Sequence, residues 1–375
     1  MSSTELENNT TSMPTKQKAL ILKDFSEGYV LEDIDIPDPG PGELLVKIQA
    51  AALNPADWKV PKWKLALPLP AVLGSDIAGD VEKVGDGVQD FKVGDRVYVS
   101  MVHSYGCLSL ISSDSFFPAE NWKDRGGYQQ YVLIKADVIA KIPDTVSYDE
   151  ASTLPLAIAT ACSGLYTEIP HGIGLIPPTR EEGHGKYSGI PIVVLGGASA
   201  VGQSVIQFAK LSGFGPIITT ASLTNEEPLK RMGATHVVDR QLSPSETVSA
   251  ITTIAGKPIL HVYDVICSEA TQQLAMDVIA DGGRAAFPTP FLTAKSSKKV
   301  EIAQVFGAAR SPHNYDLFKE LYQGKVYEWL QNGLIVPNRY EVIPGGLKGV
   351  EEGLKRLEAD DISRLKLVVH PQETA

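Results

Sequence analysis

The sequence is poor in cysteine: only three occur in 375 residues, at Cys107, Cys162 and Cys267. They are far apart along the chain, so they form neither a disulfide framework nor a C-x-x-C metal motif. A few isolated cysteines are typical of proteins from a reducing compartment. We therefore expect a cytoplasmic protein without structural disulfides.

The sequence also lacks an excess of positive charge and any long apolar run. Its formal net charge is −11, whereas a nucleic-acid-binding protein needs a basic face. No apolar run approaches the roughly 18 residues that span a bilayer. Residues 1–15 are polar and lack the apolar core of a signal peptide, so we expect a disordered tail there. These absences predict that neither nucleic acid nor a membrane is a partner.

The most informative stretch is a short apolar run followed by glycines and a helical pattern. Residues 192–195 are apolar and mostly β-branched, which predicts a buried parallel strand. Gly196 and Gly197 allow a sharp turn, and the helix that follows would aim its N-terminus at a pyrophosphate. The dinucleotide-binding pattern is imperfect, because Ser199 stands where its second glycine belongs. An ordinary strand–helix turn is the alternative. The turn residues expected at the cofactor are Gly197, Ala198, Ser199, Ala200 and Val201.

The next strand predicts which nicotinamide cofactor is bound. It covers residues 216–220 and is followed by Ala221 and Ser222, at the place where NAD-binding enzymes carry an acid for the ribose. Without that carboxylate a 2′-phosphate is not repelled, which favours NADPH. Arg240 follows the third strand and has donors suited to a phosphate, as does the Ser222 hydroxyl. The alternative for Arg240 is an ordinary surface arginine.

The order of predicted elements gives an α/β fold with two domains. Short strands with glycine turns over residues 16–155 predict a compact β-barrel-like domain, which residues 336–375 rejoin. Residues 156–335 alternate strand and helix, which predicts a doubly wound parallel sheet. Residues 170–190 are rich in proline, glycine and charge and are expected to be a surface insertion. We also expect loops at 61–70 and 101–127 and one helix at about 314–332.

Several short motifs, in order along nearly the whole chain, resemble the medium-chain dehydrogenase/reductase superfamily. Within it the chain is most similar to the zinc-free branch, in particular to fungal trans-acting enoyl reductases that serve polyketide synthases, and also to quinone oxidoreductases. The resemblance implies a GroES-like barrel domain and a Rossmann NADPH-binding domain. The matching motifs are Asn54-Pro-Ala-Asp57, Leu73-Gly-Ser-Asp-Ile-Ala-Gly79, Val93-Gly-Asp-Arg-Val97, Gly126-Gly-Tyr-Gln-Gln-Tyr131, Gly196-Gly-Ala-Ser-Ala-Val-Gly202, Met232-Gly-Ala-Thr-His-Val-Val-Asp239 and Lys366-Leu-Val-Val369.

The residues at the two expected ligand positions argue against a catalytic metal. Zinc alcohol dehydrogenases carry a cysteine in the segment that corresponds to residues 53–59 and a histidine after the glycine that corresponds to Gly74. Here the segment has no cysteine and Ser75 follows Gly74, and a serine hydroxyl is a poor zinc ligand. We therefore predict no metal. Alcohol oxidation then lacks its Lewis acid, whereas reduction of a conjugated C=C remains feasible, because hydrogen-bond donors can stabilise an enolate.

The resemblance also implies roles for individual residues. Asn54, Lys59 and Thr160 are expected beside the nicotinamide, with Lys59 as a proton donor or as a charge that neutralises substrate or cofactor. Each has a structural alternative. Asn54 could simply form an Asn-Pro turn, Lys59 could be a solvated loop lysine, and the Thr160 hydroxyl could bond to its own helical turn. Phe306 and Gly307 are expected to run past the nicotinamide, and Lys366 to contact the cofactor.

These observations together predict an NADPH-dependent reductase of a conjugated C=C. Its substrate would be a small unsaturated carbonyl compound or a carrier-bound acyl thioester, with a polyketide synthase as partner. Two alternatives stay open at this point. One is a quinone reductase using the same cofactor, and the other is an NADPH-binding protein without catalytic activity.

Overall fold

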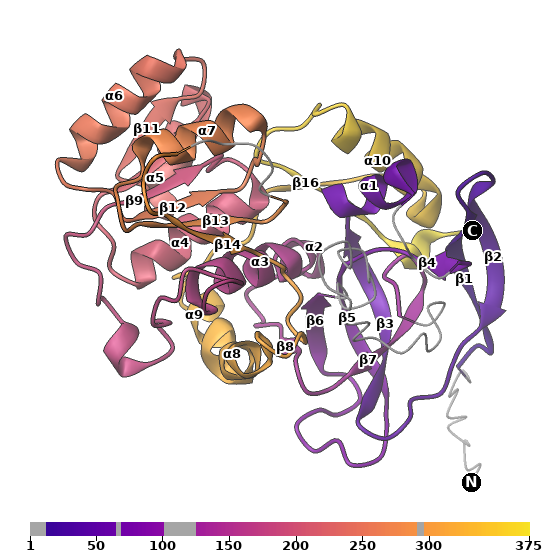
Figure 1. Cartoon of the computed structure of the whole chain (residues 1–375). Helices are drawn as coiled ribbons and strands as arrows, with labels where there is room; N and C mark the ends of the chain where they lie inside the picture. The colour runs from indigo at the N-terminus through magenta and orange to yellow at the C-terminus, as the bar shows by residue number, and fades with distance from the viewer. Residues whose placement is uncertain (1–12, 65–68, 101–124, 291–295) are drawn as a thin grey trace, which may run out of the picture.

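The computed structural model describes residues 13–64, 69–100, 125–290 and 296–375. The chain forms two halves that lie side by side, a mainly β half and an α/β half (Figure 1). The predicted tail, apart from residues 13–15, and most of the predicted loop at 101–127 lie outside the described residues.

The β half contains two sheets around an apolar core. The smaller sheet has the order β2-β1-β4, and the larger has the order β15-β16-β3-β5-β6-β8, with β7 also paired to β3. Both β3 and β5 contain runs of consecutive buried residues, so these strands are covered on both faces over part of their length. The strands are β1 (Lys16–Asp24), β2 (Gly28–Asp35), β3 (Glu43–Ala52), β4 (Ala71–Val72), β5 (Asp76–Val84), β6 (Arg96–Ser100), β7 (Tyr131–Lys135), β8 (Ala140–Lys141), β15 (Tyr340–Val342) and β16 (Lys366–Val369). Helix α2 (Tyr148–Ser152) packs on β3 and β5, and α10 (Val350–Glu358) packs on α1.

Helix α1 (Pro55–Trp63) differs from the prediction, which placed a loop from residue 61 onward. Pro61 lies inside the helix, where proline removes a backbone donor and disfavours helix. The carbonyl of Asp57, which would accept the missing N–H of residue 61, instead accepts the Tyr29 hydroxyl at 3.2 Å. The helix ends at Lys64, which has a left-handed backbone with φ 50°.

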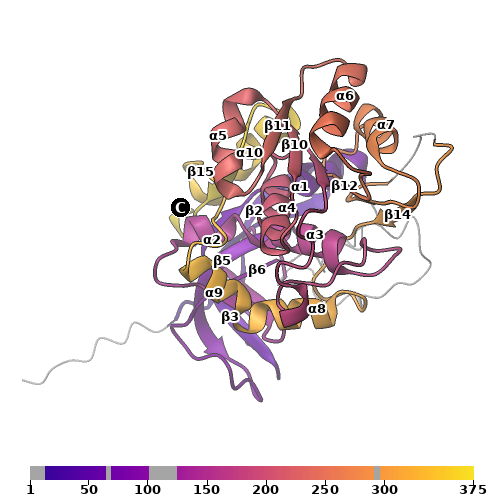
Figure 2. The same ribbon diagram turned by 90° about the vertical axis from the view of Figure 1, so that its left-hand side faces the viewer.

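The α/β half is a six-stranded parallel sheet with the order β11-β10-β9-β12-β13-β14. Numbered from its first strand, this is the 3-2-1-4-5-6 order of a Rossmann sheet, as predicted. Helices cover both faces (Figure 2): α3, α4, α5, α8 and α9 pack on one face and α6 and α7 on the other. The strands are β9 (Ile192–Leu195), β10 (Ile217–Ala221), β11 (His236–Asp239), β12 (His261–Asp264), β13 (Arg284–Phe287) and β14 (Glu301–Gln304). The helices are α3 (Pro155–Tyr166), α4 (Ala200–Leu211), α5 (Glu226–Met232), α6 (Pro244–Ala255), α7 (Glu269–Val278), α8 (Tyr315–Glu320) and α9 (Val326–Gln331).

The single helix predicted at about 314–332 is wrong, because the structure has a break between α8 and α9. Gln323 and Gly324 have non-helical backbone angles there, and Gly324 has φ 122°, which glycine adopts without strain. The break turns α9 toward β8 and α4, on which its Trp329 packs.

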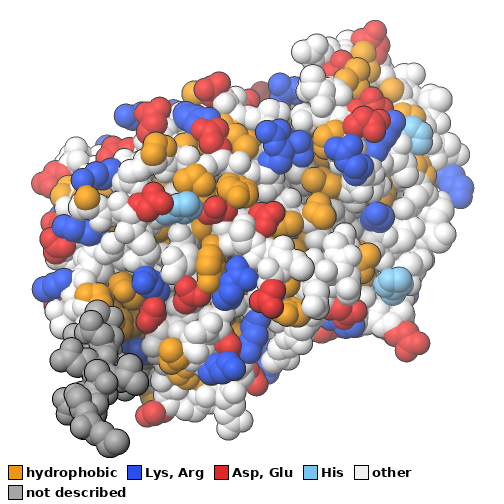
Figure 3. Space-filling view, turned by 180° about the vertical axis from the view of Figure 1, so that it is seen from behind, with side chains coloured by type: hydrophobic (Ala, Val, Ile, Leu, Met, Phe, Trp, Pro, Cys, Tyr) orange, Lys and Arg blue, Asp and Glu red, His pale blue; other side chains and the backbone are white. Residues whose placement is uncertain are grey.

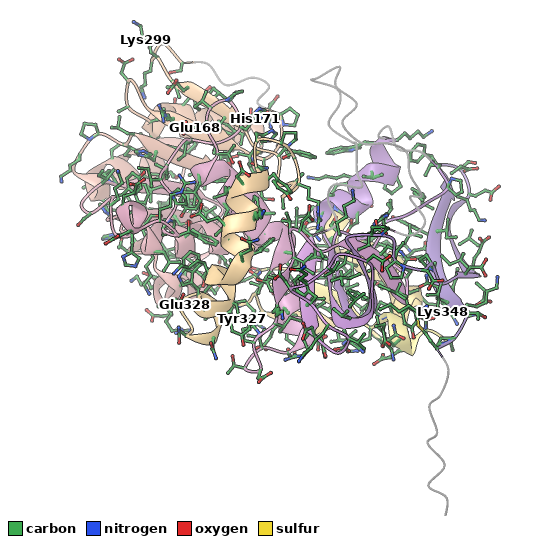
Figure 4. All side chains as sticks on the ribbon, turned by 90° about the horizontal axis from the view of Figure 1, so that it is seen from below. Glu168, His171, Lys299, Tyr327, Glu328 and Lys348 are labelled. Atoms are coloured by element: carbon green, nitrogen blue, oxygen red, sulfur yellow. The ribbon has the colours of Figure 1, made fainter. Side chains whose placement is uncertain are left out.

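The segment 170–190 is packed more tightly than a surface insertion needs to be. The Tyr187 ring stacks on Phe214 with centroids 4.7 Å apart, and its hydroxyl accepts the Ile176 N–H at 2.8 Å. At the other end the His171 ring stacks on His313 at 3.8 Å. Figure 4 places His171 and the neighbouring Glu168 on the α/β half, away from α1.

The surface carries both charge signs close together. Seen from behind, Lys and Arg alternate with Asp and Glu across both halves (Figure 3). In the part of the chain that the structure describes, no helix is long and apolar enough to cross a bilayer.

Candidate cofactor and active site

The glycine turn after β9 is packed so closely that it has no room for side chains at its glycines. Gly196 has φ +89°, and a Cβ there would lie 2.5 Å from the Ile266 side chain. A Cβ on Gly197 would lie 2.1 Å from Thr219 Oγ1, and one on Gly202 would lie 2.3 Å from the Gly196 carbonyl oxygen. Strand, turn and helix are therefore packed as closely as a dinucleotide-binding turn requires.

Ser199 replaces the second glycine without disturbing this turn. Its hydroxyl accepts the Gly202 N–H at 3.0 Å and donates to the Gly196 carbonyl at 2.9 Å, so it caps the N-terminus of α4. The N–H groups of Ala200 and Val201, in the first turn of α4, have no acceptor within the helix. Together with Ala198 in the turn, they fit the pyrophosphate of a dinucleotide.

The residues expected at the adenosine phosphate lie together at the ends of β10 and β11. The Arg240 N–H donates to the Ala221 carbonyl at 3.0 Å, which brings Arg240 alongside Ser222. The Ser222 hydroxyl is within 3.0 Å of Thr224 Oγ1. Arg240 is exposed and lines a hollow that also contains Asp360 and Asp361. Sequence reasoning missed these two carboxylates, which oppose a phosphate.

Arg364 follows Ser363, which lines this hollow, and lies within electrostatic range of Arg339 and Arg231. Burial and the nearby charges of Arg339 and Arg231 lower the pKa of Arg364. Its Nε is buried and has no hydrogen-bond partner among the described residues. An orphaned guanidinium N–H next to further positive charge fits an anionic group, such as the phosphates of a bound dinucleotide.

The residues expected at the nicotinamide also meet. Thr160 is buried on α3, and a Cβ on Gly307 would lie 2.3 Å from its Oγ1, so the backbone at Gly307 runs directly against Thr160. Phe306 is half-buried, and its carbonyl accepts from Asn314 Nδ2 at 3.0 Å. The Tyr263 hydroxyl donates to the Thr160 carbonyl at 2.7 Å, which fixes α3 on β12.

Lys59 projects from α1 toward the α/β half. Its Nζ lies 5.7 Å from the Trp58 ring centroid and 5.4 Å from that of Trp63, within cation–π range. Burial lowers the pKa of Lys59, and a thiolate at Cys267, in the loop after β12, would act in the opposite direction. Burial raises the pKa of that thiol to about 11. Lys59 thus lies within electrostatic range of Cys267 in the α/β half.

Asn54 and Lys366, which the sequence places 312 residues apart, are in direct contact. Lys366 Nζ donates to Asn54 Oδ1 at 2.6 Å and to Asp76 Oδ2 at 3.0 Å. Asn54 Nδ2 donates to the same Asp76 oxygen at 3.0 Å. All three side chains are nearly inaccessible to solvent, with 4% exposure for Asn54, 0% for Asp76 and 5% for Lys366.

A second buried carboxylate lies next to this group. Asp57 Oδ2 accepts the Asn54 N–H at 2.8 Å and the Tyr128 hydroxyl at 2.7 Å, and the Ser75 hydroxyl lies 3.4 Å from its Oδ1. Burial raises the pKa of Asp57 to about 6, although both strong hydrogen bonds act in the opposite direction. Tyr128 is fully buried under Gly74, where a Cβ would lie 2.8 Å from its ring.

These residues do not fit a catalytic zinc. Ser75, at the position expected for one metal ligand, is bonded to Asp57. Asn54, in the segment expected to supply the other, is bonded to Asp76 and Lys366, and the Lys366 ammonium is itself a cation. The described parts of the chain contain no group of three or more His, Cys, Asp and Glu side chains that could hold a metal ion. Zinc prefers thiolate and imidazole, and neither is offered here.

The structure therefore brings the expected residues into three places: the glycine turn, the adenosine end, and the junction of α1, α3 and the 306–307 segment. Sequence reasoning missed the buried carboxylates Asp57 and Asp76. A carboxylate inside the apolar run 72–78 was the available signal for Asp76, because a buried charge needs a partner.

Comparisons with known proteins agree with this architecture. Residues 40–144 match the alcohol dehydrogenase GroES-like domain, and residues 200–289 match the zinc-binding dehydrogenase domain. Among solved structures, an alcohol dehydrogenase superfamily protein from Novosphingobium aromaticivorans superposes with a TM-score of 0.74 at 23% identity, covering 94% of this chain and 99% of that one. A mycobacterial quinone oxidoreductase gives 0.69 at 22% identity, over 95% and 100%. At these identities the likeness shows the fold.

Curated relatives are more specific. A trans-enoyl reductase of Gibberella fujikuroi is 31% identical over 91% of this chain and 96% of its own length. Trans-enoyl reductase himH of Aspergillus japonicus is 30% identical over 87% and 89%, and grgB of a Penicillium species is 29% identical over 95% and 99%. The chain thus belongs to the trans-enoyl reductase family of the medium-chain dehydrogenase/reductase superfamily.

Proposed function

We propose that this protein is an NADPH-dependent enoyl reductase that reduces the conjugated C=C of an α,β-unsaturated thioester or ketone. The observation that carries the proposal is the position of Lys59, which is half-buried on α1 beside the Trp58 and Trp63 rings and within electrostatic range of Cys267 in the dinucleotide-binding half. As a member of its family the chain is an oxidoreductase that uses a nicotinamide cofactor. The choice of NADPH and the residue roles below are proposals.

When bound, the cofactor supplies the hydride that adds to the β-carbon of the acceptor. The first turn of α4 and Ser199 hold the pyrophosphate. Thr160 and Gly307 would form the floor of the nicotinamide site, because the Gly307 backbone runs directly against Thr160. Asn54 borders the same place from α1.

Lys59 meets the negative charge that develops on the acceptor carbonyl and delivers a proton to the α-carbon. A lysine whose pKa is lowered by burial gives up its proton more readily than a solvated one. The two tryptophans on α1 limit the directions in which its flexible stem can point. Lys59 thus combines the electrostatic and the acid function that an enolate requires.

The preference for NADPH is supported by the adenosine end. Ala221 and Ser222 offer no carboxylate, Arg240 lies beside them, and Arg231, Arg339 and Arg364 add positive charge on the same side. Asp360 and Asp361 line the same hollow as Arg240, and their negative charges reduce this preference. By its family we further propose that the acyl group is carried as a thioester on a polyketide synthase.

The test is turnover of three acceptors with NADPH: a 2-enoyl thioester, a 2-enal and a benzoquinone. We expect saturated thioester as the main product, with deuterium from 4-deuterated cofactor at the β-carbon. Reduction of the quinone alone would establish the quinone reductase instead. NADPH binding without turnover of any acceptor would establish a binding protein.

A further inference from the structure

A buried ion pair between Lys366 and Asp76, together with Asn54, joins three segments of the chain. Lys366 begins β16, Asn54 precedes α1, and Asp76 begins β5, so three distant segments meet at one carboxylate. Figure 1 shows β16 and α1 close together at the junction of the two halves. The second oxygen of Asp76 accepts the Leu156 N–H at 2.8 Å, which ties the group to the start of α3.

Stability alone does not account for this ion pair. Removing two charges from water is costly, and a well-packed apolar pair at a buried site is often as stable as an ion pair or more stable. What Lys366 does provide is a fixed orientation of Asn54 and a positive charge at the base of α1, which carries Lys59.

The ion pair also sets the charge at this junction. Asp57 and Asp76 are both fully buried, and beside the larger effect of burial the charge of Asp76 raises the pKa of Asp57, while that of Lys366 lowers it. Without Lys366 two carboxylates would lie behind the place where the acceptor becomes negative. Like charges at short distance in a dry site strongly disfavour that step.

Lys366 retains one unused donor. An ammonium has three N–H bonds, and Asn54 and Asp76 take two of them. The third has no acceptor among the described residues.

We propose that Lys366 is a positioning residue of the reduction, whose buried ammonium orients Asn54 and keeps the junction of α1 and α3 from becoming negative. This inference rests on the proposed enoyl reductase function. It assigns the ion pair to turnover and not to cofactor affinity, because the adenosine and pyrophosphate contacts lie elsewhere.

The test compares Lys366→Met with Asp76→Asn, which leave opposite charges unpaired in the same place. Both variants bury an unpaired charge or polar group, so both should lower the melting temperature to a similar extent. Lys366→Met should lower kcat by at least 30-fold at pH 8 and 15 °C, whereas Asp76→Asn should lower it by less than threefold. The dissociation constant of NADPH, measured by fluorescence, should change by less than threefold in both.

Lys348→Met is the matched control, because Lys348 is exposed on the β half and is labelled far from the dinucleotide-binding half in Figure 4. It should leave kcat and melting temperature unchanged. Equal losses of kcat in Lys366→Met and Asp76→Asn, in proportion to their loss of stability, would overturn the inference and make the ion pair purely structural. A larger loss in Asp76→Asn would overturn it as well. If the wild type fails to reduce the enoyl thioester, the proposed function itself is wrong, which the unmodified protein shows directly.

Discussion

Lys59 is the residue on which the proposed chemistry depends most. Lys59→Met keeps most of the stem between Trp58 and Trp63 but removes the charge and the proton. We expect turnover of an enoyl substrate to fall by about 100-fold, the scale of one lost acid or electrostatic donor. NADPH affinity should change little. Initial rates and cofactor titration by fluorescence measure the two effects separately.

Lys62→Met is the control for this variant, because Lys62 also lies over the Trp58 ring but pairs with Glu358 on the surface. It should retain near-normal turnover. Since burial lowers the pKa of Lys59, the wild-type rate should decline on the alkaline side below the ordinary titration range of lysine. Near-normal turnover in Lys59→Met would show that the proton comes from another group.

Arg240 tests the cofactor preference. Losing a charge-assisted phosphate contact costs roughly 1.5–3 kcal/mol, or about one to two powers of ten in affinity. Arg240→Ala should therefore weaken NADPH by about that factor and leave NADH nearly unchanged. Because Arg240 is exposed, the effect should shrink in high salt. Equal weakening of both cofactors in binding titrations would make Arg240 a structural residue.

Much of the site could be predicted residue by residue, but its hydrogen-bond partners could not. Glycine, arginine and lysine at motif positions indicate chemistry from local sequence alone. The partners of Asp57 come from residues 54, 75 and 128, and those of Asp76 from residues 54, 156 and 366. Contacts between such distant positions follow from the packing of the finished fold, which no local pattern specifies.

At the scale of elements, the contact between the 306–307 segment and α3 is the most sensitive part of the site. Gly307→Ala would place a Cβ 2.3 Å from Thr160 Oγ1 and 3.0 Å from its Cα and N, and a helix backbone cannot move aside cheaply. We expect turnover to fall at least tenfold and the melting temperature to fall by several degrees. Kinetics and thermal unfolding measure both.

Gly40→Ala is the matched control, because the added Cβ there meets only the Glu43 carboxylate, at 3.4 Å. It should behave like the wild type. If Gly307→Ala retained full turnover and stability, the 306–307 segment would be free to move, and the floor assigned to Thr160 and Gly307 would be wrong.

The elements themselves were predicted where their periodicity was strong and missed where a tertiary contact overrides a local signal. The parallel strands β9 and β13 are clear in sequence as short apolar runs. Helix α1 continues through Pro61 because Tyr29, from the unpredicted strand β2, satisfies the freed carbonyl of Asp57. The break between α8 and α9 occurs at Gly324, a single residue that a periodicity argument tolerates within a helix.

At the scale of the whole molecule, specific polar contacts join the two halves. Arg310 of the α/β half pairs with Asp137 at 2.9 Å and donates to the carbonyls of Lys135 and Val138 in the β half. Gln207 of α4 bonds twice to the Val336 backbone, where the chain returns to the β half. Because the proposed site lies at this junction, its geometry depends on how firmly the C-terminal residues are bonded to the rest of the β half.

The C-terminal residues are held by His370, which bonds to two carboxylates and is called the histidine clamp below. His370 Nε2 lies 2.7 Å from Asp149 in α2 and its Nδ1 lies 2.9 Å from Glu373. Burial alone would lower the pKa of His370, but the hydrogen bonds to Glu373 and Asp149 outweigh it and raise the pKa. A group with a raised folded pKa contributes stability that is full below its unfolded pKa, about 6.5, and is lost as the pH rises through the folded value.

His370→Gln should therefore destabilise the protein more at pH 6 than at pH 9. We expect its melting temperature to lie about 1–2 °C below the wild type at pH 6, the scale of a partly exposed ion pair in a chain of this size, and the difference to shrink by pH 9. His184→Gln is the control, since His184 is exposed, and it should leave the melting temperature close to that of the wild type at both pH values. A His370→Gln difference that stays constant or grows toward pH 9 would mean that the clamp acts through the neutral imidazole. The C-terminal turn would then be held by packing and by Gln372, which donates to the carbonyls of Ile48 and Gln130.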